Sequence, residues 1–462
     1  MQEPKQAPRE ASAPDGLEAP RRHWAVATIM VGILFTSLDM TMVNVALPTI
    51  AHDLAIGAGQ VVWLAIAYSL VLVVTLLPFS AVAERIGFQR MFALGVTVCA
   101  FSALACSLST SFIGLLLARM SQGVGTSMLM CLFGGLVRNI YPMRMMGLGI
   151  SLNSLAVGVT MVMGPTIGAF IMEAASWPWM FASYIPLCCL ALLGTRFLPD
   201  VSRVKRRFDW TSCVLSMLTF GLLVTGLDML AHAPLRALLC LAVAGLAGAA
   251  LVRRSRGQTA PLVPVDLLRI KPVAFAVAAS VCSFSSQMGA FVALPFYYLQ
   301  VLHYSYTDVG LLLGTWSLGT ASMAPVAGYL ADRFKVAVLC AIGAGCMATG
   351  LLCIALLPQE APFAFYAMAM LTGGVGFGFF QSPNNRALLT GGPRRRSGAA
   401  GALQATTRVF GQSLGTALVA IAFNLGGEDG ALTAIFTSMA CAMGALAVNI
   451  VRYFSPVPDS QL

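Results

Sequence analysis

Residues Leu38 to Pro48 read LDMTMVNVALP and place a carboxylate inside an apolar segment. The segment extends from Ala25 to Leu47, about 23 residues, and a helix that spans a bilayer needs about 20. Asp39 is its only charged residue. A charge at that depth costs at least about 2.5–3.5 kcal/mol. An intramembrane carboxylate therefore indicates an ion or substrate pathway, the alternative being a fixed structural group.

The chain as a whole has the composition of an integral membrane protein. Of its 462 residues, 58% are hydrophobic and 10% are charged, whereas soluble domains carry about 25% charged residues. Residues Met1 to His23 are polar and rich in Pro and Ala, which predicts a disordered tail. The twelve cysteines show no metal-ligand spacing and are interpreted as packing residues.

Hydropathy predicts an all-α membrane protein with fourteen spans. They lie near Ala25–Leu47, Val61–Ala83, Met91–Leu108, Phe112–Val137, Met146–Glu173, Trp179–Phe197, Thr211–Leu230, Leu235–Val252, Pro272–Leu299, Asp308–Ala331, Val336–Leu357, Ala361–Pro383, Gly398–Asn424 and Ala431–Val451.

The loops between these spans alternate in charge. If both termini are cytoplasmic, nearly all of the 28 Lys and Arg residues fall on the cytoplasmic side, where positive residues collect. Asp53, Glu173, Asp308 and Glu360 then fall outside. This alternation supports the count of fourteen. The net charge of +10 faces the inner leaflet of the bilayer, so no nucleic-acid surface is expected.

An internal repeat divides the chain into two halves. Residues 80–87 read SAVAERIG and end the second span, and residues 328–334 read GYLADRF and end the tenth. The acid–Arg pairs are Glu84 with Arg85 and Asp332 with Arg333. Parallel repeats of this kind are typical of secondary transporters that bind substrate at the bilayer midplane. The expected organisation is a cytoplasmic tail (1–24), a six-helix bundle (25–198), an inserted helix pair (199–271), a second six-helix bundle (272–452) and a second tail (453–462).

Arg119 is the expected partner of Asp39. Asp39 lies about 13 Å below the outer end of the first span, and Arg119 lies about 12 Å below that of the fourth. A neighbouring cation favours the charged carboxylate, and burial favours the neutral one. A carboxylate held between these effects can load and release a proton. The alternative is two unrelated helix-packing charges.

The fifth span contains GVTMVMGPTIGA at residues 158–169. Small residues four apart let helices approach closely, and Pro165 removes a backbone hydrogen bond and permits a bend. We interpret Gly164, Pro165 and Gly168 as the pivot of an outer gate. Ordinary tight packing is the alternative.

These motifs resemble the major facilitator superfamily, in particular its fourteen-helix drug:proton antiporter branch of the EmrB/QacA type. The resemblance extends over nearly the whole chain. It is carried by residues 38–48, by Arg119 with Gln122 and Gly123, by residues 164–168, 208–210 and 376–385, and by Arg408 to Gly411. It implies proton coupling at Asp39 and Arg119 and a gate latched by Glu84, Arg85, Asp332 and Arg333.

The chain departs from the family pattern at several positions. The loop after the second span has Ser80, Glu84, Phe88 and Gln89 where the family has Gly, Asp and a basic run. The sixth span opens with Trp177-Pro178-Trp179 instead of Trp-Arg-Trp, and Tyr184 replaces an Asn. Thr160 and Ala169 stand where Gly is typical. The lost basic residues weaken the expected latch.

Candidate substrate contacts are large, amide or sulfur-containing side chains within the spans, because Met and aromatic residues suit adaptable surfaces. The alternative for each is a core or lipid-facing position. The candidates are Phe35, Trp63, Tyr68, Met128, Asn153, Met161, Phe284, Gln287, Met288, Phe291, Trp316, Phe379 and Gln381.

The expected function is proton-driven efflux of lipophilic, in part cationic, compounds across a bacterial inner membrane, as in antibiotic resistance. No cofactor beyond the proton gradient and no metal is expected. The resemblance adds a periplasmic adaptor as a candidate partner. A narrow-substrate metabolite exporter or an uptake symporter is the main alternative. A subunit of a redox proton pump would need more buried Lys and Glu, and an enzyme would need a His, Cys and acid cluster, which no span carries.

Overall fold

The computed structural model describes residues 16–142, 156, 160, 163–199, 209–229, 233–255, 267–331, 333–390 and 397–455, and all regular structure in these ranges is helical. The helices are α1 (Arg21–Asp53), α2 (Ala58–Val61), α3 (Trp63–Ile86), α4 (Phe88–Ser107), α5 (Phe112–Ile140), α7 (Pro178–Ala182), α8 (Tyr184–Gly194), α9 (Trp210–Met229), α10 (Pro234–Ser255), α11 (Lys271–Phe296), α12 (Tyr306–Leu330), α13 (Val336–Leu356), α14 (Phe363–Thr390), α15 (Ser397–Gly426) and α16 (Gly430–Phe454). Residues 163–174 are also helical. Short turns occur at η2 (Thr195–Phe197), η3 (Leu267–Arg269), η4 (Tyr297–Val301) and η6 (Gly427–Asp429).

Twelve helices in the described ranges are long and apolar enough to span a membrane. The predicted count of fourteen spans is not confirmed. One of the two other predicted spans coincides with α9, a helix of 20 residues whose described side chains form the apolar stretch Trp210–Gly226. The other, near 146–173, lies largely outside the described residues.

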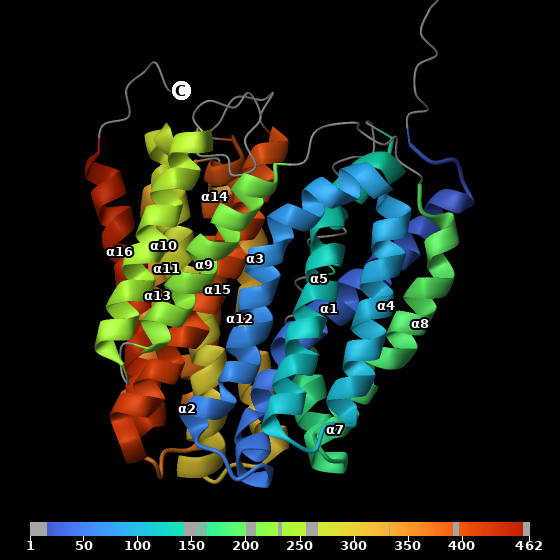
Figure 1. The fold of residues 1–462 in the computed structure, drawn as a ribbon. Coiled ribbons are helices and arrows are strands. Elements are labelled where there is room, and N and C mark those ends of the chain that lie inside the picture. Colours follow the sequence, from blue (N-terminus) through green and yellow to red (C-terminus); the bar gives the residue numbers. More distant parts are fainter. Residues whose placement is uncertain are drawn as a thin grey trace, which may run out of the picture.

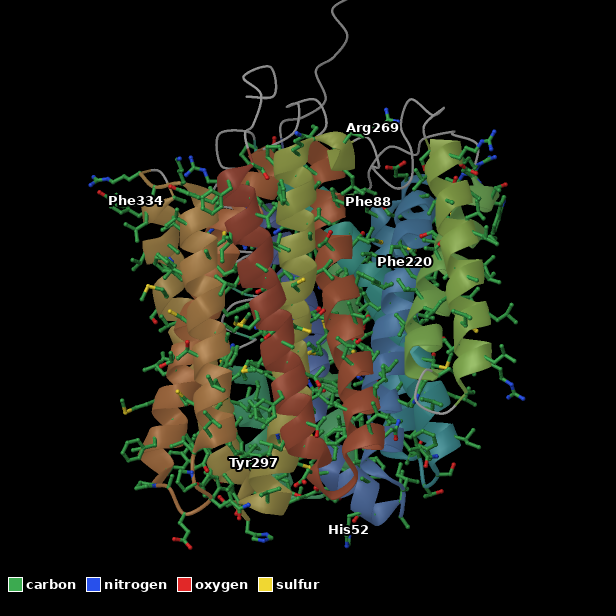
Figure 2. All side chains as sticks on the ribbon, turned by 90° about the vertical axis from the view of Figure 1, so that its left-hand side faces the viewer. His52, Phe88, Phe220, Arg269, Tyr297 and Phe334 are labelled. Atoms are coloured by element: carbon green, nitrogen blue, oxygen red, sulfur yellow. The ribbon has the colours of Figure 1, made fainter. Side chains whose placement is uncertain are left out.

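The helices stand side by side and alternate in direction between two ends of the molecule (Figure 1). The end where α1 begins and α16 ends carries Arg21, Arg90, Lys271 and many further basic residues, and we call it the basic end. The opposite end, called the acidic end, carries Asp53, Glu173, Asp308, Glu360 and Asp429. Figure 2 shows Arg269 and Phe334 near the basic end and His52 near the acidic end.

Large apolar side chains cover the sides of this bundle. Phe101, Leu193 and Leu246 are among many that are exposed along α4, α8 and α10. A soluble protein rarely exposes contiguous apolar surface of this extent. The exposed belt and the spans together show a multi-pass membrane protein.

The helices form two halves, with α9 and α10 packed against each other beside them. In the N-terminal half α5 packs on α3 and α4, and in the C-terminal half α14 packs on α12 and α13 while α11 packs on α15 and α16. Helix α9 contacts α3 and α15, one from each half. Asp209 begins α9 by accepting the amide N–H of Ser212 at 3.1 Å, and it pairs with Arg254 of α10 at 3.0 Å.

The hydrophobic cores differ between the two ends. A large core, called the shared core, joins the halves, with Leu38 and Val45 of α1 among its members beside Phe291 of α11 and Leu313 of α12. Toward the basic end one core holds buried residues of the N-terminal half alone, and another holds buried residues of the C-terminal half alone.

Polar contacts also join the halves toward the acidic end. The hydroxyls of Thr49 and Tyr306 are hydrogen bonded, and Thr166 donates to the carbonyl of Gly310 at 3.0 Å. The described contacts therefore seal the two halves together on the acidic side.

Candidate functional site

The predicted partners Asp39 and Arg119 form a buried ion pair. Asp39 lies in α1 and Arg119 in α5, and each residue is 1% exposed. Arg119 Nη1 donates to Asp39 Oδ1 at 2.6 Å. Charged groups are almost never fully buried unless they are paired, so the pair accounts for how both charges are tolerated within the spans.

Gln122 completes a triad that sequence reasoning left out of the site. It lies one turn after Arg119, and its Oε1 accepts a second hydrogen bond from Arg119 Nη1 at 2.9 Å. Its Nε2 donates to Asp39 Oδ1 at 3.0 Å. The position of Gln122 could have been predicted from the sequence, because side chains three residues apart share one face of a helix.

The two oxygens of Asp39 have different environments. Oδ1 accepts from both Arg119 and Gln122, whereas Oδ2 is buried and has no hydrogen-bond partner among the described residues. A buried, unpaired carboxylate oxygen is costly. It is also the oxygen that can take up a proton without displacing either donor.

Aromatic rings cover the guanidinium of Arg119. The guanidinium carbon lies 4.2 Å from the ring centroid of Tyr68 and 5.7 Å from that of Phe181. Cation–π contacts stabilise a desolvated cation by about 2 kcal/mol or more. The Tyr68 hydroxyl donates to Thr126 at 3.1 Å, which fixes the ring.

A close helix approach holds this arrangement together. Gly123 follows Gln122, and a Cβ there would lie 2.6 Å from the backbone oxygen of Tyr68. Only glycine lets α5 approach α3 so closely. The spacing of Arg119, Gln122 and Gly123 therefore both supplies the polar groups and positions them.

The predicted fifth-span motif packs beside this triad. Gly164, Pro165 and Gly168 are buried, Gly164 faces Thr41 of α1, and a Cβ on Gly168 would lie 3.1 Å from the Met42 carbonyl oxygen. Because Thr166 contacts Gly310 of α12, the segment connects the neighbourhood of Asp39 to the seam between the halves.

The predicted latch residues lie at the basic end. Glu84 and Arg85 are exposed at the end of α3, which stops at Gly87 with φ of 96°. The Arg333 guanidinium carbon lies 4.8 Å from the Tyr329 ring centroid. Asp332 lies outside the described residues.

The substrate contacts of the predicted cavity residues stay a prediction, and the structure shows how these side chains pack. Several pack as core side chains: Phe284 makes an edge contact with Phe377 at 5.5 Å, and Phe291 does so with Trp316 at 5.8 Å. Met288 and Gln287 are buried, and Asn44 Nδ2 donates to Met288 Sδ at 3.9 Å.

The remaining candidates are spread over both halves. Phe35 belongs to the basic-end core of the N-terminal half and Met128 packs against it, while Tyr68 covers Arg119. Trp63, Phe379 and Gln381 are half-buried. Asn153 and Met161 lie outside the described residues. No three His, Cys, Asp or Glu side chains gather as metal ligands within the described ranges.

Long apolar helices in two halves, with a buried ion pair between α1 and α5, define a membrane transporter. The family model "Major Facilitator Superfamily" matches residues 29–416, and the chain belongs to this family. Over 447 residues it is 42% identical to "Uncharacterized transporter YebQ" of Escherichia coli K12, with 96% of this chain and 98% of that protein aligned.

More distant relatives are named for different functions. "Riboflavin transporter RibZ" of Clostridioides difficile is 29% identical over 86% of this chain and 87% of its own. "Multidrug efflux pump LfrA" of Mycolicibacterium smegmatis is 28% identical over 89% of this chain and 82% of its own. A crystal structure of a POT family transporter covers 93% of this chain and 94% of its own, with a TM-score of 0.70 at 13% identity, and shows the fold alone.

Proposed function

We propose that this transporter is a proton-coupled exporter of lipophilic compounds that works by drug:proton antiport and alternating access. The observation that carries the proposal is the Asp39–Arg119–Gln122 triad, with one bonded and one unbonded carboxylate oxygen. Intramembrane ionisable residues of this kind commonly form proton relays. The efflux relative supports the choice of substrate class.

The coupling step begins on Asp39 Oδ2. A proton there neutralises the carboxylate and removes its electrostatic attraction for Arg119. The guanidinium keeps its bond to Gln122 Oε1 and its contacts with Tyr68 and Phe181, so it stays solvated by protein while α1 is released from it. Loss of the proton restores the ion pair.

Alternating access would come from opening and closing of the contacts between the two halves. The shared core and the Thr49–Tyr306 and Thr166–Gly310 contacts close the acidic side. We propose that the basic end is cytoplasmic, with both termini there, in a bacterial inner membrane. The described conformation is then the one in which the outer side is sealed. Thr41 and Met42, which contact the segment 163–174, transmit the movement of α1 to that seal.

A narrow-substrate transporter is the second candidate. The similarity to a riboflavin transporter favours it, because that relative aligns with most of both chains. A polyspecific exporter should move protons in response to several unrelated compounds, and a narrow transporter in response to one class.

The experiment is substrate-evoked proton movement in proteoliposomes. Wild type is compared with Asp39→Asn, and Asp209→Asn serves as the control because it makes the same change in a partly exposed ion pair at the start of α9. We expect proton movement with several lipophilic drugs in wild type and in the control, and none in Asp39→Asn. Uphill transport by Asp39→Asn at the wild-type level, with protons still coupled, would refute the proposal.

A further inference from the structure

Arg408 is a second intramembrane arginine, and unlike Arg119 it has no acidic partner among the residues that the structure describes. It lies in α15, five residues inside the span Leu403–Gly426. Its Nε is buried without a hydrogen-bond acceptor, and no ion pair forms at it among the described residues. Among the side chains that the structure describes, the buried carboxylate is that of Asp39, which Arg119 already neutralises. Arg408 therefore leaves one uncompensated positive charge within the spans.

The neighbours of Arg408 in sequence fix the direction in which it faces. Gly411 packs on α11, since a Cβ there would lie 2.9 Å from the Val281 carbonyl oxygen, and its own carbonyl accepts from Ser285 Oγ at 2.8 Å. On the other side, Val409 packs with Met40 of α1 and with Tyr68, Leu72, Val73 and Val74 of α3. Successive residues of an α-helix are about 100° apart. Arg408 consequently lies on the sector of α15 between α11 and the N-terminal half.

Gln412 lies one turn further along the same sector. It is 2% exposed, and its side-chain Oε1 is buried without a partner among the described residues. Its backbone carbonyl is already used, because the Thr416 hydroxyl donates to it at 2.9 Å. Two polar groups spaced four residues apart thus face the junction of the halves with unused hydrogen-bonding capacity.

We propose that Arg408 and Gln412 form a binding subsite for the acid group of the substrate, and that the preferred substrate is a lipophilic organic anion with a carboxylate. This rests on the proposed function, in that substrate passes between the halves. A guanidinium binds a carboxylate through two parallel hydrogen bonds, and a rotated Gln412 amide donates a third. Val409, Met40 and the ring pair of Phe410 with Phe220, 5.3 Å between centroids, provide apolar surface nearby. The uncompensated charge disfavours the cationic substrates expected from sequence.

A matched ligand series tests the charge preference. Pyrenebutyrate, its neutral amide and pyrenebutylamine share one fluorescent body and differ in one group. Their binding to purified protein in detergent is measured by fluorescence anisotropy without a proton gradient, so the result is independent of proton coupling. The variants are Arg408→Gln, Arg408→Lys and Gln412→Leu. Arg236→Gln is the control, because it makes the same change at an exposed position of α10.

We expect wild type and Arg236→Gln to bind pyrenebutyrate at least about tenfold more tightly than the amide, and the amine most weakly. Arg408→Gln should lose this preference, Arg408→Lys should keep part of it, and Gln412→Leu should reduce it severalfold. Each variant is first checked for a monodisperse elution profile. Equal binding of all three ligands by wild type, or an unchanged preference in Arg408→Gln, would overturn the proposal. So would displacement of pyrenebutyrate by phosphatidylglycerol that depends on Arg408, because a lipid phosphate would then be the natural occupant.

Discussion

A double-mutant cycle on Asp39 and Arg119 tests whether the buried pair stabilises the protein as one unit. Removing one partner of a buried ion pair costs about 3–5 kcal/mol, because the other charge is left uncompensated. Asp39→Asn leaves Arg119 with Gln122 Oε1 and two rings, and Arg119→Gln leaves a buried carboxylate with the Gln122 amide as its hydrogen-bond donor and no countercharge. The double variant contains neither charge, so its cost should be smaller than the sum of the single costs by about 2–3 kcal/mol.

The free energy of unfolding of these variants is measured in mixed micelles by titration with SDS. A parallel cycle on Asp209 and Arg254 provides the scale, because that pair is exposed and is expected to couple by less than about 1 kcal/mol. If the costs of Asp39→Asn and Arg119→Gln were additive, or if the two cycles gave the same coupling, the pair would not be the electrostatic unit described here.

Three further predictions concern the elements around the site. Gly123→Ala should lower the free energy of unfolding by about 1–3 kcal/mol in the same titration, since its Cβ meets the Tyr68 carbonyl oxygen; wild-type stability would contradict this. Thr49→Cys with Tyr306→Cys, in a background without the native cysteines, should be bridged by a bifunctional methanethiosulfonate about as long as the lost tyrosine ring, and transport should stop until the bridge is reduced. Unimpaired transport by the bridged protein would show that the acidic end does not open during transport. Asn384→Ala should destabilise by about 2–3 kcal/mol, because its amide donates to Ala276 and Ser280, and circular dichroism on heating reports the loss.

The sequence was sufficient to predict the buried pair because depth in a membrane can be computed from residue counts. Asp39 and Arg119 are close in depth by the rise of their helices, and the structure brings them into contact at 2.6 Å. The alternation of charged loops likewise predicted which ends of the helices lie together. Gln122 follows from the same helical geometry and could have been included.

The substrate surface stays a prediction, because hydropathy gives the depth of a residue and not the direction in which its side chain faces. Phe284 and Phe291 are apolar and mid-span, and only the packing of α11 on its neighbours shows that they fill the shared core. The count of spans is limited in the same way. Hydropathy predicts the inserted helix α9, and a helix of 20 residues forms there, but length and composition over its described stretch Trp210–Gly226 do not by themselves make it a membrane span.

Direct electrostatics at the two arginines and the proposed antiport give opposing expectations for how a proton affects the binding of an anionic substrate. When a proton neutralises Asp39, Arg119 becomes an uncompensated cation, in addition to Arg408. Direct electrostatics would then tighten the binding of a carboxylate as the pH falls, and a proton and an anion that bind together are the signature of symport. Antiport requires that protonation weaken the binding of the substrate. The proton must therefore act through a change in how the halves pack.

The contacts of α1 provide that route. Thr41 and Met42, two and three residues from Asp39, touch the segment 163–174, which reaches α12 through Thr166. Met40, the residue after Asp39, packs in one cluster with Val409 beside Arg408, so a shift of α1 on protonation also alters one border of the Arg408 sector. For antiport we expect pyrenebutyrate to bind wild type more weakly as the pH is lowered, with little pH dependence in Asp39→Asn. Tighter binding at low pH in wild type, lost in Asp39→Asn, would refute antiport and assign the same residues to proton-coupled uptake.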